Sequence, residues 1–253
     1  MERGSGAKAS GDIVRGDGPR RPAHAERAAQ TVLDPVLVSG RYHALSQLPE
    51  TLPVFPLSGV LLLPRGHLPL NVFEPRYLAM VDFAFSSTRL IGMVQPSEPE
   101  EKTLKPALHP VGCAGRITSY RENEDGRYLI TLTGICRFRC EEEIEAATPF
   151  RQLRVSFSEF AGDLEPADDS AFPRDHLLHA LKGYLSRRDL KADWQSVMNA
   201  PAETLVNALA MLCPFEPAEK QALLEAKGWS ERVAILVALL EMAGAAAGPA
   251  SIN

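Results

Sequence analysis

The stretch that decides the fold is residues 48–81, LPETLPVFPLSGVLLLPRGHLPLNVFEPRYLAMV. Prolines at positions 49, 53, 56, 64, 69 and 75 divide this apolar stretch into short pieces. Because proline lacks a backbone N–H donor, it favours strand edges, strand starts and turns over the interior of a helix. The predicted pieces are strands near 52–57, 60–63 and 68–73, with turns at Ser58-Gly59 and Arg65-Gly66.

The end of this stretch changes to helical spacing. Pro75 suits a first helical turn, and apolar residues then recur on one face, which predicts a helix over about 75–86. The apolar run at 89–95 that follows predicts a buried strand. Four prolines in the segment 96–110 predict a surface loop.

Further along the chain, the sequence predicts a hairpin of two strands, 111–120 and 126–140. Asp125-Gly126 is a strong turn signal, and apolar residues occupy the even positions of the second strand, so one face is expected to be buried. Arg137 and Arg139 fall on the other face, which we expect to be solvated. Gly134 predicts a bulge or a close backbone approach. A last strand is predicted around Leu153, Val155 and Phe157.

After this strand, the spacing of the apolar residues changes from every second residue, as in a strand, to every 3.6 residues, as in a helix. The acidic, proline-broken segment 159–175 predicts a joint rather than an element. Four apolar helical stripes follow, and Gly228 suits the cap that ends the third helix. The stripes contain Leu177, Leu178, Leu181, Tyr184 and Leu185; Leu205, Leu209 and Leu212; Leu223 and Leu224; and Val233, Leu236, Val237 and Leu240. The predicted fold class is therefore α+β: a small curved, mixed or antiparallel sheet or pseudo-barrel with one helix, followed by a C-terminal helical bundle.

Composition narrows the class of protein. The chain has 253 residues, of which 45% are hydrophobic and 23% charged, as in ordinary globular proteins. Its formal net charge of −5, from 27 basic and 32 acidic residues, argues against a general attraction to nucleic-acid phosphates. The four cysteines show no CxxC spacing, so we expect reduced core thiols rather than disulfides or a zinc site.

Both ends of the chain are expected to lie outside the fold. Residues 1–47 are rich in Gly, Ala, Arg and Pro and show no apolar period, which predicts a disordered leader. Residues 244–253 predict a flexible tail. The continuous apolar stretch of a secretory signal is missing from the first thirty residues, so we expect a cytoplasmic protein with no membrane partner.

No sequence motif for catalysis is found. The phosphate-binding GxxxxGK[ST] loop needs a Gly-Lys dipeptide, which the chain lacks, and the nucleophile motif GxSxG is also absent. His176 and His179 could share one helix face as metal ligands, but no third ligand is indicated, and capping or solvated side chains fit them better. We therefore expect no enzyme activity, no cofactor and no metal.

Three residues where a strand turns into a helix are candidate peptide-binding residues: Glu74, Arg76 and Tyr77. Side chains at such a junction can project into a binding surface. A local interpretation is also open, in which Glu74 favours the positive helix start, Arg76 forms a local ion pair and Tyr77 packs below.

The segments taken together resemble the Lon N-terminal (substrate-binding) domain family, which has a PUA-like fold. The resemblance is carried by the opening stretch at 52–81, then IGMVQP, HPVGCAGRITSY, the Asp125-Gly126 turn and LITLTGICRFRC, in the order and spacing of the family. It covers about 49–243. It implies a Lon N-terminal-like β domain at 48–160 and a helical bundle at 161–243.

In full-length Lon proteases this region recognises and tethers substrate proteins, and separate AAA+ and Ser-Lys protease domains act on them. The resemblance implies a stand-alone member without those domains. Our leading hypothesis is a non-enzymatic module that binds unfolded or exposed hydrophobic segments, with a role as an adaptor for a separate ATP-dependent protease left open. The alternative is a PUA-like RNA-binding protein, which a basic patch around Arg116, Arg121, Arg137 and Arg139 would support.

Overall fold

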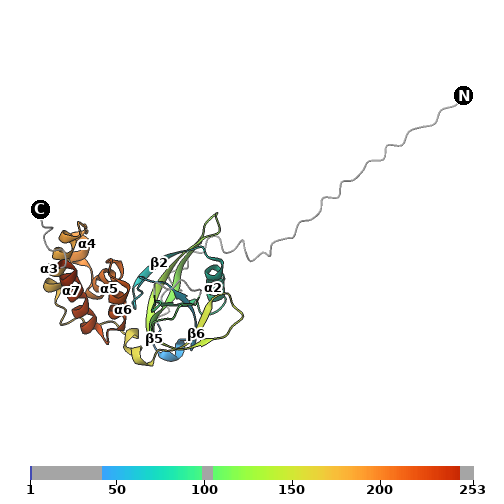
Figure 1. Ribbon diagram of the computed structural model, residues 1–253, viewed down its shortest axis with the longest axis horizontal. Helices are drawn as coiled ribbons and strands as arrows, with labels where there is room; N and C mark the ends of the chain where they lie inside the picture. The colour runs from blue at the N-terminus through green and yellow to red at the C-terminus, as the bar shows by residue number, and fades with distance from the viewer. Residues whose placement is uncertain (2–41, 99–104, 246–253) are drawn as a thin grey trace.

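The fold is taken from a computed structural model, which describes Met1 and residues 42–98 and 105–245. The predicted tail beyond 245 and most of the predicted leader lie outside the described residues. The described end of the leader forms a short 3-10 turn, η1 (Leu45–Gln47), before the first strand. Figure 1 shows the strands gathered beside a separate group of helices, α3 to α7.

A mixed sheet forms the first part of the described chain. Its strands are β1 (Thr51–Pro56), β2 (His67–Val72), β3 (Leu90–Val94), β4 (Val111–Glu122), β5 (Tyr128–Ile144) and β6 (Arg151–Ser156). They follow the order β2-β5-β4-β3-β1-β6, and β5 also pairs with β6, which curls the sheet into a partial ring. β1 and β3 are parallel, whereas the other pairs are antiparallel. The α+β class and the curved mixed sheet are confirmed.

The predicted strand at 60–63 is wrong. Leu61, Leu62 and Leu63 are buried, but they form a loop that crosses the middle of β5 instead of pairing along a strand. A Cβ on Gly134 would lie 2.0 Å from the Leu63 carbonyl oxygen, so only glycine permits this crossing. The predicted close approach at Gly134 is confirmed, and the pairing with β4 shifts register beside it.

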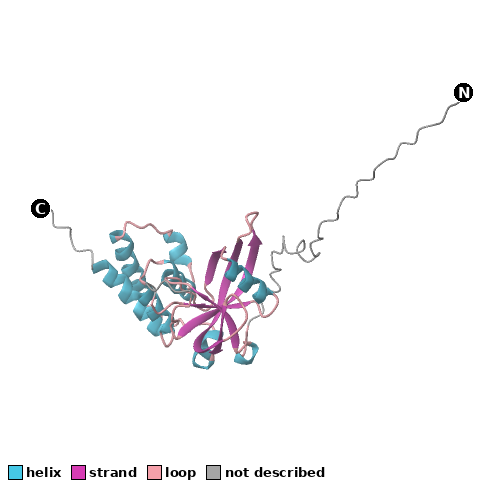
Figure 2. Cartoon of the chain, turned by 45° about the vertical axis from the view of Figure 1, so that its right-hand side comes forward, coloured by secondary structure: helices cyan, strands magenta, loops and turns pink. Residues whose placement is uncertain are grey.

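The other predicted elements of this half are confirmed with small changes of bounds. α2 (Pro75–Phe85) lies beside the sheet in Figure 2 and begins at the predicted proline. The turn between β4 and β5 contains Gly126 with a φ of 80°, a conformation that favours glycine. Pro96 and Leu108 form an isolated bridge within the predicted 96–110 loop, of which residues 99–104 lie outside the described part.

The bundle contains α3 (Arg174–Arg187), α4 (Trp194–Asn199), α5 (Ala202–Leu212), α6 (Pro217–Glu225) and α7 (Trp229–Ala245). The four predicted helices are present. The structure adds α4, which was not predicted because a helix of six residues is too short to show a repeating apolar pattern. Leu212 is 82% exposed and does not belong to the buried stripe of α5, because the helix ends there. Gly228 does not cap α6, which ends at Glu225 and has Ala226 as its C-cap. The Gly228 carbonyl instead accepts from the Arg232 amide in the first turn of α7.

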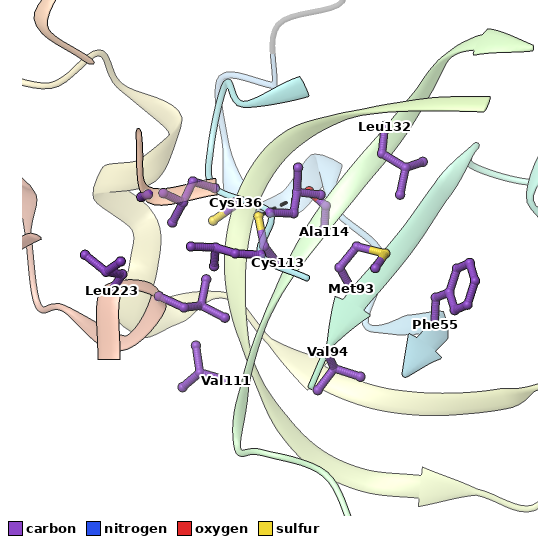
Figure 3. Packing of buried hydrophobic residues seen from close by; sticks show 14 of the residues in the cluster. Phe55, Met93, Val94, Val111, Cys113, Ala114, Leu132, Cys136 and Leu223 are labelled. Atoms are coloured by element: carbon purple, nitrogen blue, oxygen red, sulfur yellow. Dashed lines mark hydrogen bonds between the residues drawn. The ribbon is translucent and has the colours of Figure 1, made fainter. Parts of the chain in front are cut away.

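The junction between sheet and bundle corrects two further predictions. The segment expected to be only a joint contains a 3-10 helix, η2 (Ser158–Leu164), with Phe160 and Asp163 buried. Arg137, predicted to be solvated, is 2% exposed because the bundle covers the outer face of β5 there. One hydrophobic cluster runs through both parts, and Figure 3 shows Leu223 of α6 near Val111 and Cys113 of β4.

The cysteines are free thiols, three of them buried and Cys140 half-buried. Burial raises the pKa of Cys136 to about 12 and those of Cys140 and Cys213 to about 11. Of the helices that the structure describes, none is long and apolar enough to cross a membrane.

Candidate functional site

A groove of about 750 Å³ opens at one end of the partial ring, between the start of α2 and the connection from β5 to β6. Its walls are mainly proline, aromatic and aliphatic. The described residues that line it are Pro56, Arg76, Tyr77, Pro96, Lys105, Pro106, Glu143, Ile144, Glu145, Ala146, Thr148, Pro149, Phe150 and Arg151. Prolines gather there because strands β1 and β3 both end at this side of the sheet, where a missing N–H breaks no ladder.

One wall contains two of the three sequence-predicted residues. The Arg76 guanidinium lies over the Tyr77 ring, 4.5 Å from its centroid, and Tyr77 in turn packs on Phe55 at 4.1 Å between centroids. Glu74 does not line the groove, but its Oε2 accepts from Arg76 Nε at 2.9 Å. Burial raises the pKa of the Tyr77 hydroxyl, so the ring is neutral at pH 7. Arg76 and Tyr77 thus line the groove, and Glu74 pairs with Arg76 beside it.

The opposite wall is the connection between β5 and β6, which sequence reasoning missed. Arg151 donates two bonds to Glu143, from Nε to Oε1 at 3.1 Å and from Nη2 to Oε2 at 2.6 Å. Its Nη1 also donates to the Pro106 carbonyl at 2.7 Å, which ties a third segment to this wall. The side chain is only 14% exposed, so it is a fixed feature of the groove rather than a mobile surface charge.

The only sequence signal for this wall was Pro149-Phe150 ahead of the last strand. Phe150 is buried, and its ring lies 5.3 Å from that of Phe83 on α2. This contact holds the β5–β6 connection against the helix, and Phe83 itself is 36% exposed. The arrangement presents apolar and proline surface between two fixed arginines, which suits an extended apolar segment with carbonyl groups to accept hydrogen bonds.

The two histidines considered as metal ligands lie elsewhere. His176 Nε2 lies 2.9 Å from Glu241 Oε1 on α7, and His179 is exposed on the same helix, α3. Within residues 42–98 and 105–245, no group of three or more His, Cys, Asp or Glu side chains is placed to hold a metal ion.

The four arginines of the possible RNA-binding patch are dispersed over different local contacts. Arg116 donates to the Tyr42 hydroxyl at 3.0 Å, and Arg121 donates to the Asn123 side chain. Arg139 pairs with Glu159 at 2.6 Å, and Arg137 is buried at the junction. One of the four is therefore buried, and the other three are engaged by neighbouring side chains, which weakens the case for a patch that contacts nucleic-acid phosphates.

Comparisons with known proteins agree with this architecture. Residues 51–242 match the family described as the ATP-dependent protease La (LON) substrate-binding domain. Among curated relatives, the Lon protease of Flavobacterium johnsoniae is 26% identical over 199 residues, covering 74% of this chain and 23% of that protein. The Lon protease of Desulfosudis oleivorans is 31% identical over 101 residues, covering 39% of this chain and 12% of that protein. The chain thus spans less than a quarter of these relatives.

Two solved structures extend the agreement to the fold. The Lon N-terminal domain protein of Xanthomonas campestris aligns with a TM-score of 0.51 and 25% identity, covering 74% of this chain and 97% of that one. The N-terminal domain of Mycobacterium avium complex Lon protease aligns with a TM-score of 0.55 at 16% identity, covering 75% and 97% of the two chains. The sheet, the bundle and their order are shared along nearly the whole of both domains, and the chain belongs to the Lon substrate-binding domain family.

Proposed function

We propose that this chain is a polypeptide-recognition module that binds exposed hydrophobic segments of unfolded or partly folded proteins in the groove between α2 and the β5–β6 connection. The observation that carries the proposal is the composition of the groove, in which eight proline, aromatic or aliphatic residues lie among the charged side chains of Arg76, Lys105, Glu143, Glu145 and Arg151. Membership in a substrate-binding family supports a polypeptide as the ligand.

The energetics favour modest affinity and broad specificity. Burial of apolar surface contributes about 25 cal/mol per Å², and an extended segment brings many small contacts rather than one anchor. A flexible ligand loses conformational entropy on binding, which offsets part of that gain. The two arginines supply donors for the backbone carbonyls that every polypeptide carries, so recognition depends little on the order of its side chains.

The proposed partners are therefore unfolded or partly folded proteins, and a separate ATP-dependent protease that receives them is a proposed second partner. The names of the curated relatives, which are Lon proteases, support the second proposal. RNA binding is not proposed, because one of the four arginines that would support it is buried and the other three have local partners.

The test compares two neighbouring alanines. Both are exposed, but Ala146 lines the groove and Ala147 does not. In fluorescence anisotropy with labelled, chemically unfolded proteins, Ala146→Asp should weaken binding by about tenfold, since it places a charge against apolar surface. Ala147→Asp adds the same charge outside the groove and should leave affinity within about twofold. Absence of binding by the unmodified chain, or equal losses in the two variants, would contradict the proposal.

A further inference from the structure

A second cavity, of about 240 Å³, lies at the junction of sheet and bundle. Segments from β5, η2, α5 and the start of α7 all contribute to it. The lining residues are Arg65, Arg137, Glu159, Phe160, Gly162, Asp163, Glu165, Pro166, Ala167, Asp168, Glu203, Lys227, Gly228, Trp229 and Arg232. Charged residues of both signs make up much of this wall, so their pairing decides what the cavity can bind.

Two of the four cations in the wall are neutralised by partners. Arg137 pairs with Asp163, with 2.8 Å between Nε and Oδ2. Arg65 pairs with Glu203 and also donates to the Asp163 carbonyl at 2.6 Å. In both pairs the positive charge already has a carboxylate partner.

Arg232 is different, because it is a buried charge with an unused donor. The residue is 4% exposed, and its Nε donates to the Leu223 carbonyl at 3.2 Å. Its Nη2 has no hydrogen-bond partner in the part of the chain that the structure describes. Burial, and then the neighbouring Arg137 guanidinium, lower the pKa of Arg232 to about 10, so it still carries its charge at pH 7. Asp163 and Glu203 offset part of this lowering, but neither forms an ion pair with Arg232. A buried guanidinium without a directly paired anion is costly, and an anion arriving in the cavity would relieve that cost.

Lys227 is the fourth cation, exposed at the same cavity, and its ammonium forms no ion pair with any described residue. Glu165 and Asp168 also line the cavity and would repel a doubly charged anion such as phosphate more strongly than a singly charged one. They would attract a cation attached to the same ligand. Phe160 and Trp229 add apolar surface.

We propose that this cavity binds the carboxyl-terminal carboxylate of a polypeptide, with Arg232 and Lys227 as its donors. The proposal rests on the proposed function in one respect, namely that the ligand is a polypeptide. A lysine or arginine a few residues before the terminus would meet Glu165 and Asp168, so the preferred chain end is apolar with one basic side chain.

One local movement is required for this contact. Arg232 Nη2 is fully covered in the described structure, so the guanidinium must turn to present it. Rotation about the Cδ–Nε bond moves Nη2 and also turns the coplanar Nε–H away from the Leu223 carbonyl, so the incoming carboxylate replaces that hydrogen bond.

The experiment uses a short fluorescent peptide of apolar sequence with one lysine a few residues before its end, made with a free or an amidated carboxyl terminus. The full chain should bind the free-acid peptide about tenfold more tightly than the amide, the effect of one charge-assisted contact. Lys227→Gln and Arg232→Met should each reduce that preference, whereas Lys191→Gln, an exposed lysine outside the cavity, should keep it. Because Lys227 is exposed, its variant tests the site even if Arg232→Met does not fold.

Competition distinguishes the sources of the anion. Millimolar acetate should displace part of the free-acid peptide if any carboxylate suffices, and inorganic phosphate should displace less. Equal affinity for acid and amide, or a preference that survives Lys227→Gln unchanged, would overturn the proposal. Ala146→Asp separates the two sites: loss of groove binding with an intact acid preference upholds this cavity alone, and the reverse pattern upholds the groove alone.

Discussion

Arg137 and Asp163 form a buried ion pair with two parallel bonds, Nε to Oδ2 at 2.8 Å and Nη2 to Oδ1 at 2.9 Å. Arg137 Nη1 also donates to the Leu224 carbonyl at 2.9 Å and to the Ala226 carbonyl at the end of α6. A single side chain of β5 therefore joins the sheet, η2 and the bundle. Because its donors are used in this way, Arg137 is a structural residue and not a contact for an external partner.

Breaking this pair should destabilise the fold strongly. Asp163→Asn removes the negative charge and leaves the Arg137 guanidinium, whose side chain is 3% exposed, without a counter-charge. We expect a loss of about 3 kcal/mol in the free energy of unfolding measured with urea. Glu159→Gln is the control, because it removes the partner of the exposed Arg139 and should cost less than about 1 kcal/mol. Equal losses in the two variants would show that burial does not govern the pair.

A methyl group at Gly134 should also be poorly tolerated. The added Cβ would lie 2.0 Å from the Leu63 carbonyl oxygen, and backbone cannot move aside as a side chain can. Gly134→Ala is expected to lower the free energy of unfolding by about 3 kcal/mol or more. Gly162→Ala, where nothing lies within 4 Å of the added Cβ, should change it by less than about 1 kcal/mol. Chemical denaturation of both variants in parallel provides the comparison.

The buried thiol of Cys213 predicts a pH dependence of stability. Its pKa is raised by burial from 9.0 to about 11, so above pH 9 the unfolded chain loses this proton while the folded chain keeps it. The contribution is complete below pH 9 and is lost as the pH rises toward 11. Urea unfolding at pH 8, 9 and 10 should therefore show a steeper decline for the unmodified chain than for Cys213→Ala. Parallel declines would mean that this thiol ionises equally in both states.

Arg76 should matter for binding more than for stability. In its ion pair with Glu74, the Arg76 side chain is 34% exposed and the Glu74 side chain 44% exposed. Arg76→Ala should therefore change the free energy of unfolding by less than about 1 kcal/mol. The same variant uncovers the Tyr77 ring and removes a groove donor, and should weaken binding of unfolded proteins three- to tenfold or so. Arg154→Ala, which removes an exposed arginine outside the groove, should leave binding unchanged. An equal loss in both variants would point to general charge attraction.

Local sequence signals predicted most elements of this fold because each one has a local physical cause. Pro75 and the apolar spacing after it placed α2, and Asp125-Gly126 placed the hairpin between β4 and β5. The strand predicted at 60–63 failed because three consecutive leucines are buried equally well by a loop that crosses under β5. Burial alone does not require pairing, and no local signal tells the two apart.

The sites show a similar division. Arg76 and Tyr77 were found because a strand turns into a helix there, but Arg151 and Glu143 face them only through the curl of the sheet, which joins β5 to β6. The alternation of apolar residues predicted the correct face of β5 for Arg137 but the wrong exposure. This alternation cannot show that a bundle distant in sequence covers that face. Long-range packing, not local propensity, supplied what the residues by themselves did not indicate.

Besides the shared hydrophobic cluster, three side chains of the bundle donate hydrogen bonds to backbone carbonyls of the first half of the chain. Asn207 donates to the Pro64 carbonyl, Lys220 to that of Gly59 and Gln221 to that of Val111. An acceptor of this kind is present whatever amino acid occupies the position, whereas each donor is one particular side chain. A substitution at any of the three acceptor positions therefore leaves a carbonyl in place, whereas replacement of Asn207, Lys220 or Gln221 by an apolar residue removes the hydrogen bond itself.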